Sequence, residues 1–359
     1  MRRLLWLWCV ILWVCLAGGV DGQVRHELPF PAIPGYETLK CDFHMHTVFS
    51  DGSVWPPVRV DEAWRVGLDA IAVTDHIEYQ PHEEDVPTRH NRSYELAVGR
   101  ARQCGVLLAR GAEITRDTPP GHFNAIFLEN VDPLETDDLV DVIKRANDQG
   151  AFVFWNHPGW KGPELGRWTD VHTQLYEKGW LHGIEVANGE TYYPEAHRWC
   201  LEKQLTMMGN SDIHGPDLRL RNTAADHRTM TLVFVTERTL DGLKAALKAG
   251  RTAVWLQDRI IGRREWIEPL FYASLEVEPP HLRTNNALWV KMANGSAVDI
   301  RLENRGQLGP AELVLPADSV TLVRIAGRNL DGPLALPYTA TNFLVAPDRS
   351  LDVTLRIPE

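Results

Sequence analysis

The residues with the clearest chemical potential in this chain are histidines and carboxylates that recur in short clusters. They lie in the segments Asp42-Phe43-His44-Met45-His46, Ser50-Asp51-Gly52, Thr74-Asp75-His76, Gly111-Ala112-Glu113, Gly121-His122, Asn156-His157-Pro158 and Ser211-Asp212-Ile213-His214. Imidazole nitrogens and carboxylate oxygens are the ligands that hard or borderline divalent metals take in proteins. If the fold gathers these clusters, they predict one pocket that binds divalent cations.

His44 and His46 are two residues apart, so on a strand both side chains point to the same face. A surface pair of histidines would explain this motif if it stood alone. Two imidazoles on one inward face, however, need partners for their polar nitrogens. Asp212 and His214 repeat the spacing after another apolar run. The two motifs together favour metal ligands.

Glu113 follows an apolar run and falls at the end of a predicted strand. An interior carboxylate is costly unless it is paired or bridges cations. Metal bridging is the favoured role, and a salt bridge to Arg110 or Arg116 is the alternative.

These clusters fall at the ends of apolar runs that predict strands. The runs are residues 39–46, 69–74, 106–113, 122–128, 151–156, 183–187 and 206–210. Amphipathic stretches that predict helices separate several of them, at 58–66, 93–104, 137–149 and 196–204. The alternation predicts a parallel sheet closed by helices, a barrel-type α/β domain. Active sites of such barrels lie at the C-terminal ends of the strands, where most of the clusters fall.

From about residue 263 the pattern changes to short β-forming runs between Gly, Asn, Asp and Pro turns. These runs are residues 287–292, 297–303, 311–315, 319–326 and 351–357. They predict a small all-β module of the sandwich type. A packing, oligomerisation or substrate-rim role is open for it, and no pattern indicates an oligomeric state.

The N-terminus reads as a secretory signal peptide, with two arginines, an apolar run over 4–17 and Gly18-Gly19. The run is shorter than the roughly 20 residues that span a bilayer, so an uncleaved anchor is the weaker alternative. We therefore expect a signal peptide at 1–22, an α/β domain at 23–262 and a β domain at 263–359. The mature protein would be periplasmic or secreted.

Composition limits the partners. The 359 residues are 44% hydrophobic, enough for one large domain with a full core and a smaller module. The formal net charge of -11 argues against a nucleic-acid partner.

The ordered motifs over residues 40–256 resemble the PHP (polymerase and histidinol phosphatase) superfamily of metallophosphoesterases. The resemblance implies a distorted seven-stranded β/α barrel that holds two or three metal ions, with Mn²⁺ favoured and Zn²⁺ or Fe²⁺ as alternatives. It assigns to a first metal His44, His46, Glu113 and Asp212. Glu113 would bridge to a second metal held by His122 and His157. A third metal would take His76, His214 and Asp51.

Two metals that share a carboxylate lower the pKa of a bound water and clamp phosphoryl oxygens. The expected nucleophile is a metal-bridging hydroxide, with Asp212, His214 or His76 as the proton shuttle for the leaving group. Asp75 is either a further ligand or, as we favour, an acceptor that orients His76.

Substrate contacts are predicted at three basic loop residues, Lys161, Arg116 and Arg89, for which an ordinary solvated loop charge is an equal alternative. Trp160 and Trp168 are candidates for a leaving-group pocket, and core packing is the alternative. Because few basic residues lie near the motifs, a dianionic monoester would find few partners there.

A signal peptide and a β module distinguish this chain from cytosolic histidinol phosphatases. It is similar to exported PHP-type phosphodiesterases, including the Sb-PDE group. Hydrolysis of small organic phosphodiesters is therefore favoured. The alternatives are a phosphomonoesterase of the same superfamily and a non-catalytic exported protein that binds metal or glycan.

Overall fold

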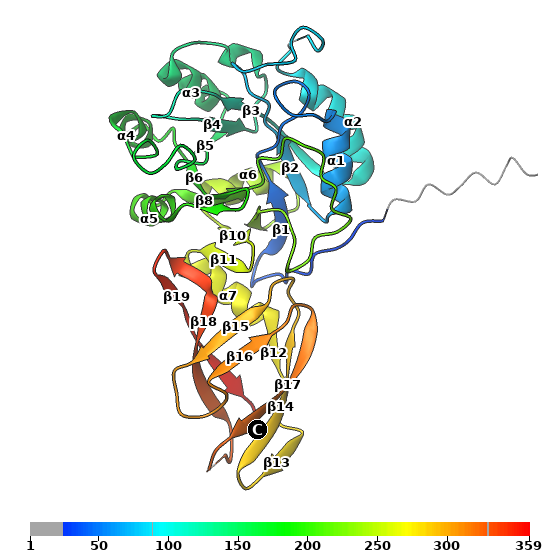
Figure 1. Cartoon of the computed structure of the whole chain (residues 1–359), viewed down its shortest axis with the longest axis vertical. Coiled ribbons are helices and arrows are strands. Elements are labelled where there is room, and N and C mark those ends of the chain that lie inside the picture. Colours follow the sequence, from blue (N-terminus) through cyan, green and yellow to red (C-terminus); the bar gives the residue numbers. More distant parts are fainter. Residues whose placement is uncertain (1–23, 88, 329) are drawn as a thin grey trace, which may run out of the picture.

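The computed structural model describes residues 24–87, 89–328 and 330–359. An α/β part and an all-β part follow one another along the long axis of the molecule (Figure 1). The expected signal peptide, residues 1–22, lies outside the described residues. Within the described ranges no helix has the length and apolar character needed to cross a membrane.

All seven strands expected in the α/β domain are present. They are β1 (Glu37–Asp42), β2 (Ala70–Val73), β3 (Leu107–Ile114), β4 (Phe123–Ile126), β5 (Phe152–Trp155), β6 (Gly183–Asn188) and β8 (Thr206–Asn210). Each pairs with the next in this order. A parallel bridge between Met45 and Ile213 then joins the chain after β8 to the chain after β1. The pairing therefore runs in a ring of seven strands, as expected for a distorted barrel.

Helices lie around these strands (Figure 1). They are α1 (Pro56–Arg65), α2 (Arg92–Cys104), α3 (Leu139–Asp148), α4 (Asp170–Glu177), α5 (Pro194–Lys203) and α6 (Leu240–Lys248). In α3 the buried residues Val142, Ile143 and Ala146 recur at helical spacing, and the Asp138 side chain accepts a hydrogen bond from Asp141 N as the N-cap. Burial of one apolar stripe fixes such a helix to the barrel.

The sheet is not wholly parallel, because β4 runs antiparallel to both β3 and β5. Only residues 115–122 separate β3 from β4. A parallel crossover needs a dozen or more residues, so this short connection forces the chain to turn back. The start of β4 therefore lies at the same mouth as the ends of its neighbours, which places His122 there.

The sheet continues beyond β1 through antiparallel strands. They are β9 (Met230–Val235), β10 (Thr252–Leu256) and β11 (Arg259–Gly262). On the other side the short β7 (Thr191–Tyr192) pairs with β6. Helix α7 (Arg264–Ser274) follows β11, and a 3-10 helix, η2 (Asp132–Leu134), lies before α3.

The C-terminal part is a β-sandwich, as expected. Its strands are β12 (Leu275–Val277), β13 (Leu282–Thr284), β14 (Ala287–Asn294), β15 (Ile300–Asn304), β16 (Glu312–Leu315), β17 (Ser319–Ala326), β18 (Leu334–Ala346) and β19 (Arg349–Ile357). One sheet has the order β16-β15-β18-β19, and β14 joins β12, β13 and β17 in the other. Alternate residues of β19 are buried between the sheets. Strand β11 pairs with β18, so one sheet crosses the expected boundary at residue 263.

Candidate metal centre

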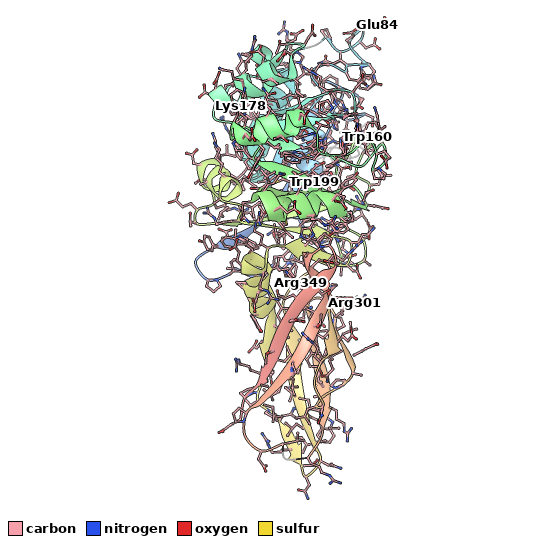
Figure 2. The ribbon with its side chains drawn as sticks, turned by 90° about the vertical axis from the view of Figure 1, so that its left-hand side faces the viewer. Glu84, Trp160, Lys178, Trp199, Arg301 and Arg349 are labelled. Atoms are coloured by element: carbon pink, nitrogen blue, oxygen red, sulfur yellow. The ribbon has the colours of Figure 1, made fainter. Side chains whose placement is uncertain are left out.

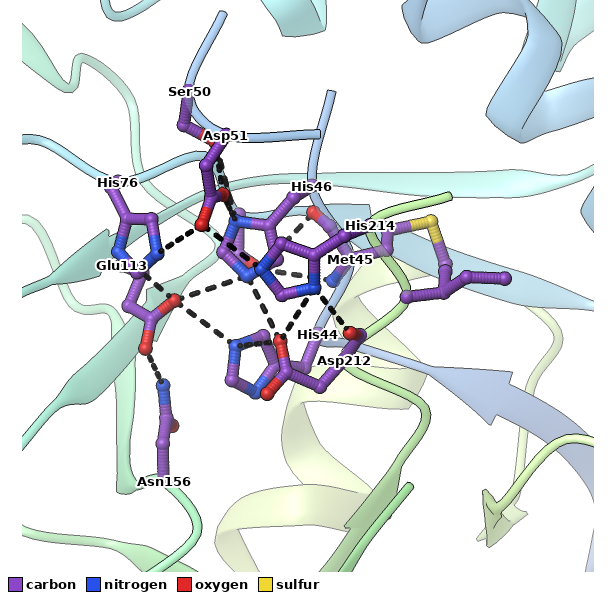
Figure 3. Close-up of polar contacts among 12 residues, drawn as sticks. His44, Met45, His46, Ser50, Asp51, His76, Glu113, Asn156, Asp212 and His214 are labelled. Atoms are coloured by element: carbon purple, nitrogen blue, oxygen red, sulfur yellow. Dashed lines mark hydrogen bonds and ion pairs between the residues drawn. The ribbon is translucent and has the colours of Figure 1, made fainter. Parts of the chain in front are cut away.

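The nine side chains predicted as metal ligands converge at the mouth of the barrel. Figure 3 shows seven of them, all but His122 and His157. They form overlapping groups whose donor atoms lie within 4.8 Å of one another. The members are His44, His46, Asp51, His76, Glu113, His122, His157, Asp212 and His214. Ligands from the ends of β1, β2, β3, β5 and β8 meet one from the start of β4.

Glu113 lies at the centre of this group and is fully buried. Its Oε2 lies 3.1 Å from His44 Nε2 and 3.2 Å from His46 Nε2, while Oε1 lies 2.9 Å from His122 Nδ1. Its carboxylate also lies within 3.5 Å of the imidazoles of His76 and His157. One oxygen therefore faces one set of imidazoles and the second faces another, as a bridging carboxylate requires.

The alternative partner of Glu113 was an arginine. Arg116 forms its ion pair with Glu78 instead, and Arg110 lies over the Tyr94 ring. In the described ranges no arginine forms an ion pair with Glu113. Besides the imidazoles, the carboxylate contacts Asn156, whose Nδ2 donates to Oε1 at 2.9 Å.

Asp212 approaches the same imidazoles from the opposite side. Its Oδ1 lies 3.2 Å from His44 Nε2 and 3.1 Å from His46 Nε2. Both Asp212 and His157 have left-handed backbone, with φ of 53° and 27°. Such conformations cost of the order of 1–3 kcal/mol each and persist where the surroundings enforce them. Here Asp212 N donates to His44 O and His157 N donates to the Glu185 carboxylate.

Asp51 lies with the remaining histidines. Its Oδ2 is 3.2 Å from His214 Nε2 and 3.6 Å from His76 Nε2, and Oδ1 is 3.5 Å from His46 Nδ1. The loop that carries Asp51 needs Gly52, because a Cβ there would lie 2.5 Å from the His46 carbonyl carbon. The Ser-Asp-Gly motif thus lets the chain fold closely over His46.

Glu185 contacts a predicted ligand and was missed by the sequence analysis. It is fully buried in β6, where Oε1 lies 2.9 Å from His44 Nδ1 and accepts a hydrogen bond from Asn210. Because a carboxylate only accepts, this contact places a proton on His44 Nδ1 and leaves Nε2, which faces Glu113 and Asp212, as the nitrogen that would bind a metal. An acidic residue inside the apolar run 183–187 was the available signal.

Asp75 does not orient His76 as expected. Its carboxylate accepts hydrogen bonds from Thr47 N at 2.6 Å, Thr47 Oγ1 at 2.7 Å and Ser50 Oγ at 2.8 Å. His76 Nδ1 lies 2.7 Å from Thr115 Oγ1. Adjacent side chains in extended backbone point to opposite sides, so the expected contact was geometrically unfavourable. Asp75 instead holds the loop that carries Asp51.

Arg59 on α1 ties the two ligand segments together and was also missed. The side chain is fully buried, and Nε donates to His46 O at 2.8 Å. Its Nη atoms donate to His214 O and Gly215 O, both at 2.7 Å, and pair with Glu62. One side chain therefore links the His-Met-His segment to the Asp-Ile-His segment.

Electrostatics in the centre favour positive charge. Burial opposes ionisation of Glu113 and Asp212, but nearby imidazoles, those of His76 and His44 for Glu113 and of His44 and His46 for Asp212, lower both carboxyl pKa values well below their usual range. Burial also opposes the His46 imidazolium, yet contacts to Asp212 and Glu113 raise the pKa of His46 to about 10. A cavity that stabilises carboxylates and attracts protons to imidazoles also attracts metal cations.

The donor set fits divalent metals. Six imidazoles and three carboxylates supply nitrogen and oxygen ligands. His46 Nε2 is buried without a hydrogen-bond partner although two carboxylate oxygens lie within 3.2 Å. A buried nitrogen directed between two carboxylates is the arrangement that a shared cation would complete.

A cavity of about 800 Å³ opens above the cluster, and Asp51, His76, Glu113, His122, His157, Asp212 and His214 contribute to its wall. Of the basic residues expected to contact substrate, Arg116 and Lys161 line the cavity and Arg89 does not. Trp160 also lines it, whereas Trp168 packs against Trp155 and Trp199. Trp160 projects from the surface of the α/β part (Figure 2).

The same architecture occurs in a solved structure. A two-domain protein from Bacteroides vulgatus ATCC 8482, which contains a predicted PHP-like metal-dependent phosphoesterase, is 45% identical with a TM-score of 0.88. The match covers 94% of this chain and 100% of that one. This chain belongs to the PHP-like metal-dependent phosphoesterases. In this PHP-family chain, residues 275–356 match a family of Ig-like domains, DUF5001.

Other similarities are more limited. An uncharacterized protein of Methanocaldococcus jannaschii is 44% identical over 46 residues, which are 13% of this chain and only 21% of that protein. An amidohydrolase from Chromobacterium violaceum is 16% identical with a TM-score of 0.36, over 49% of this chain and 88% of that one.

Proposed function

We propose that this protein is an exported phosphodiesterase that hydrolyses small organic phosphodiesters with two or three divalent metal ions, Mn²⁺ favoured. The observation that carries the proposal is the contrast within one cavity. Seven of the nine metal-type ligands line it, with His44 and His46 buried behind them, while Arg116 and Lys161 are the only arginine and lysine in its described wall. Arg116 is already paired with Glu78. A monoanionic diester needs fewer cationic contacts than a dianionic monoester, so this wall favours the diester.

The chain's own residues prepare the site. His44, His46, Glu113 and Asp212 would hold one metal, His122 and His157 with Glu113 a second, and His76, His214 and Asp51 a third. When bound, the metals would activate water and neutralise phosphoryl charge. Glu185 fixes the tautomer of His44, and Arg59 holds the two ligand segments in register. His76, His214 and Asp212 all line the cavity, where a leaving alkoxide could take a proton from one of them.

The decisive experiment compares metal-replete protein on bis(p-nitrophenyl) phosphate and p-nitrophenyl phosphate. We expect turnover of the diester with a higher kcat/KM than the monoester, and loss of turnover after chelation that added Mn²⁺ restores. A higher kcat/KM for the monoester would make the protein a phosphatase. Metal-replete protein that is inert toward both esters would refute an enzymatic role and favour a binding protein.

A further inference from the structure

Beyond the metal-type ligands, the cavity has an outer rim formed by two aromatic residues, two acids and two cations: Tyr79, Trp160, Asp117, Asp137, Arg116 and Lys161. The Tyr79 ring lies 5.8 Å from the His76 ring, and the Trp160 ring lies 5.8 Å from that of His122. Each aromatic ring therefore contacts a metal-type histidine on one side. About half of each side chain stays exposed, 51% for Tyr79 and 50% for Trp160. Aromatic surface is thus available directly above the metal centre.

The carboxylates of the rim are free to bind a ligand. Asp117 and Asp137 are both exposed, and neither side chain forms a hydrogen bond or ion pair with another residue in the described part of the chain. Their two loops are held together by Arg116, which donates to Thr115 O and to Thr136 O, both at 2.7 Å. The two acids therefore extend from a fixed junction at one side of the cavity.

The positive charge of Arg116 and Lys161 does not neutralise the negative charge of Asp117 and Asp137. Arg116 is neutralised by its ion pair with Glu78. Lys161 Nζ lies over the Trp160 ring, 4.7 Å from its centroid. The rim thus has two carboxylates without an ion pair in the described residues and one lysine without an ion pair. The position of that lysine shows that the Trp160 ring accepts an ammonium group. Aromatic faces with adjacent carboxylates attract alkylammonium groups, with roughly 0.5–2 kcal/mol from each cation–π contact.

We infer that the preferred substrate is a zwitterionic phosphodiester, one of whose ester substituents carries a quaternary ammonium or protonated amine. This inference rests on the proposed phosphodiesterase function. The metal centre would take the phosphoryl anion, and the outer rim would take the cation. In the reaction, the oxygen of water bonds to phosphorus and the P–O bond to one alcohol breaks. That alcohol leaves with one proton of the water, and the product is a phosphomonoester that keeps the other proton or releases it.

The test compares two esters that differ by one charge. p-Nitrophenyl phosphorylcholine and p-nitrophenyl 3,3-dimethylbutyl phosphate have the same shape, with a quaternary nitrogen in one and a quaternary carbon in the other. We expect kcat/KM to be about tenfold higher for the choline ester, given the combined cation–π and carboxylate contacts. The preference should fall as salt is raised, since the rim carboxylates are exposed.

Substitutions in the rim test whether its side chains cause the preference for the choline ester. Asp117→Asn with Asp137→Asn should lower the ratio of the two kcat/KM values several-fold, to the part that the aromatic rings supply. Lys161→Gln should raise it, because a competing cation is removed. The matched control, Glu83→Gln with Glu84→Gln, removes two exposed charges outside the cavity wall and should leave the ratio unchanged.

Equal kcat/KM values for the two esters in the wild-type protein would overturn the inference and leave the phosphodiesterase proposal standing. A preference that the double aspartate substitution leaves undiminished would also overturn it. If metal-replete protein hydrolyses neither ester, the proposed function itself fails.

Discussion

The two ends of this molecule bury different kinds of side chain. In the β-sandwich, the inward residues of β19 are Leu351, Val353, Leu355 and Ile357, and the burial alternates with period two. At the barrel mouth the buried groups are imidazoles and carboxylates. Apolar burial stabilises a fold directly, whereas buried charge is costly unless it is compensated. The sandwich is therefore built for stability, and the mouth is built for binding cations.

The largest expected effect on the barrel mouth comes from substituting Glu113, the proposed bridging carboxylate. Glu113→Ala removes the group that faces five imidazoles, so bound metal should fall and kcat toward bis(p-nitrophenyl) phosphate should drop by about 10³-fold or more. Elemental analysis and steady-state kinetics measure both effects. Glu113→Gln is the matched control for volume, and it should also lose metal. Full turnover in either variant would contradict the bridging role.

In the sandwich, Leu355→Ala should lower stability and leave catalysis unchanged, the opposite of what is expected at the barrel mouth. Leu355 is 1% exposed, and its truncation should lower the free energy of unfolding by about 2–4 kcal/mol through lost burial and a cavity. kcat per folded molecule should not change. Leu322→Ala on β17 is the control, since that side chain is 58% exposed and its loss should have little effect on stability. A large loss of kcat in the Leu355 variant would show that the two ends are coupled.

Glu185→Gln tests whether the contact between Glu185 and His44 supports metal binding. The amide keeps the volume but disturbs the contact to His44 Nδ1, so metal affinity or kcat should fall by roughly 10- to 100-fold. Competition with a chelating dye measures the affinity. An unchanged metal affinity and kcat would show that His44 is oriented by other contacts.

The smallest expected effect concerns a buried histidine outside the metal centre. His172 is fully buried, and burial lowers its pKa to about 4. Its Nε2 donates to Pro120 O, and Nδ1 accepts from Thr169 N, so the neutral ring is fully satisfied. As the pH falls below about 6.5 the unfolded chain binds this proton first, so stability is full above that pH and is lost toward pH 4.

His172→Gln should therefore remove part of that pH dependence, of the order of 2 kcal/mol between pH 6.5 and 4. Thermal unfolding of chelator-treated wild type and variant across this range measures it. Equal slopes in the two proteins would contradict the assignment.

The sequence was sufficient for the parts of the site that follow a repeating rule. Strand period two placed His44 with His46, and strand ends placed His157 and Glu113 at one mouth. The inverted direction of β4 was not foreseen, although the motif before it still located His122.

Contacts between segments that are distant in the sequence could not be predicted from local patterns. Glu185 lies 141 residues from His44, and Arg59 reaches a segment 155 residues away. Neither partner is indicated by local spacing. Asp75 was assigned to the nearest histidine, yet its hydrogen bonds go to a loop 28 residues back. Local pattern predicts which residues carry chemistry, and only the three-dimensional fold shows which groups hold them.

The central claim is that Glu113 bridges a multinuclear metal centre at the barrel mouth. Anomalous diffraction at the manganese edge, from crystals grown with Mn²⁺, tests it most directly. We expect two or three anomalous peaks within coordination distance of the nine ligands, two of them sharing the Glu113 carboxylate. A mouth without anomalous peaks, or a single peak that does not contact Glu113, would contradict the account.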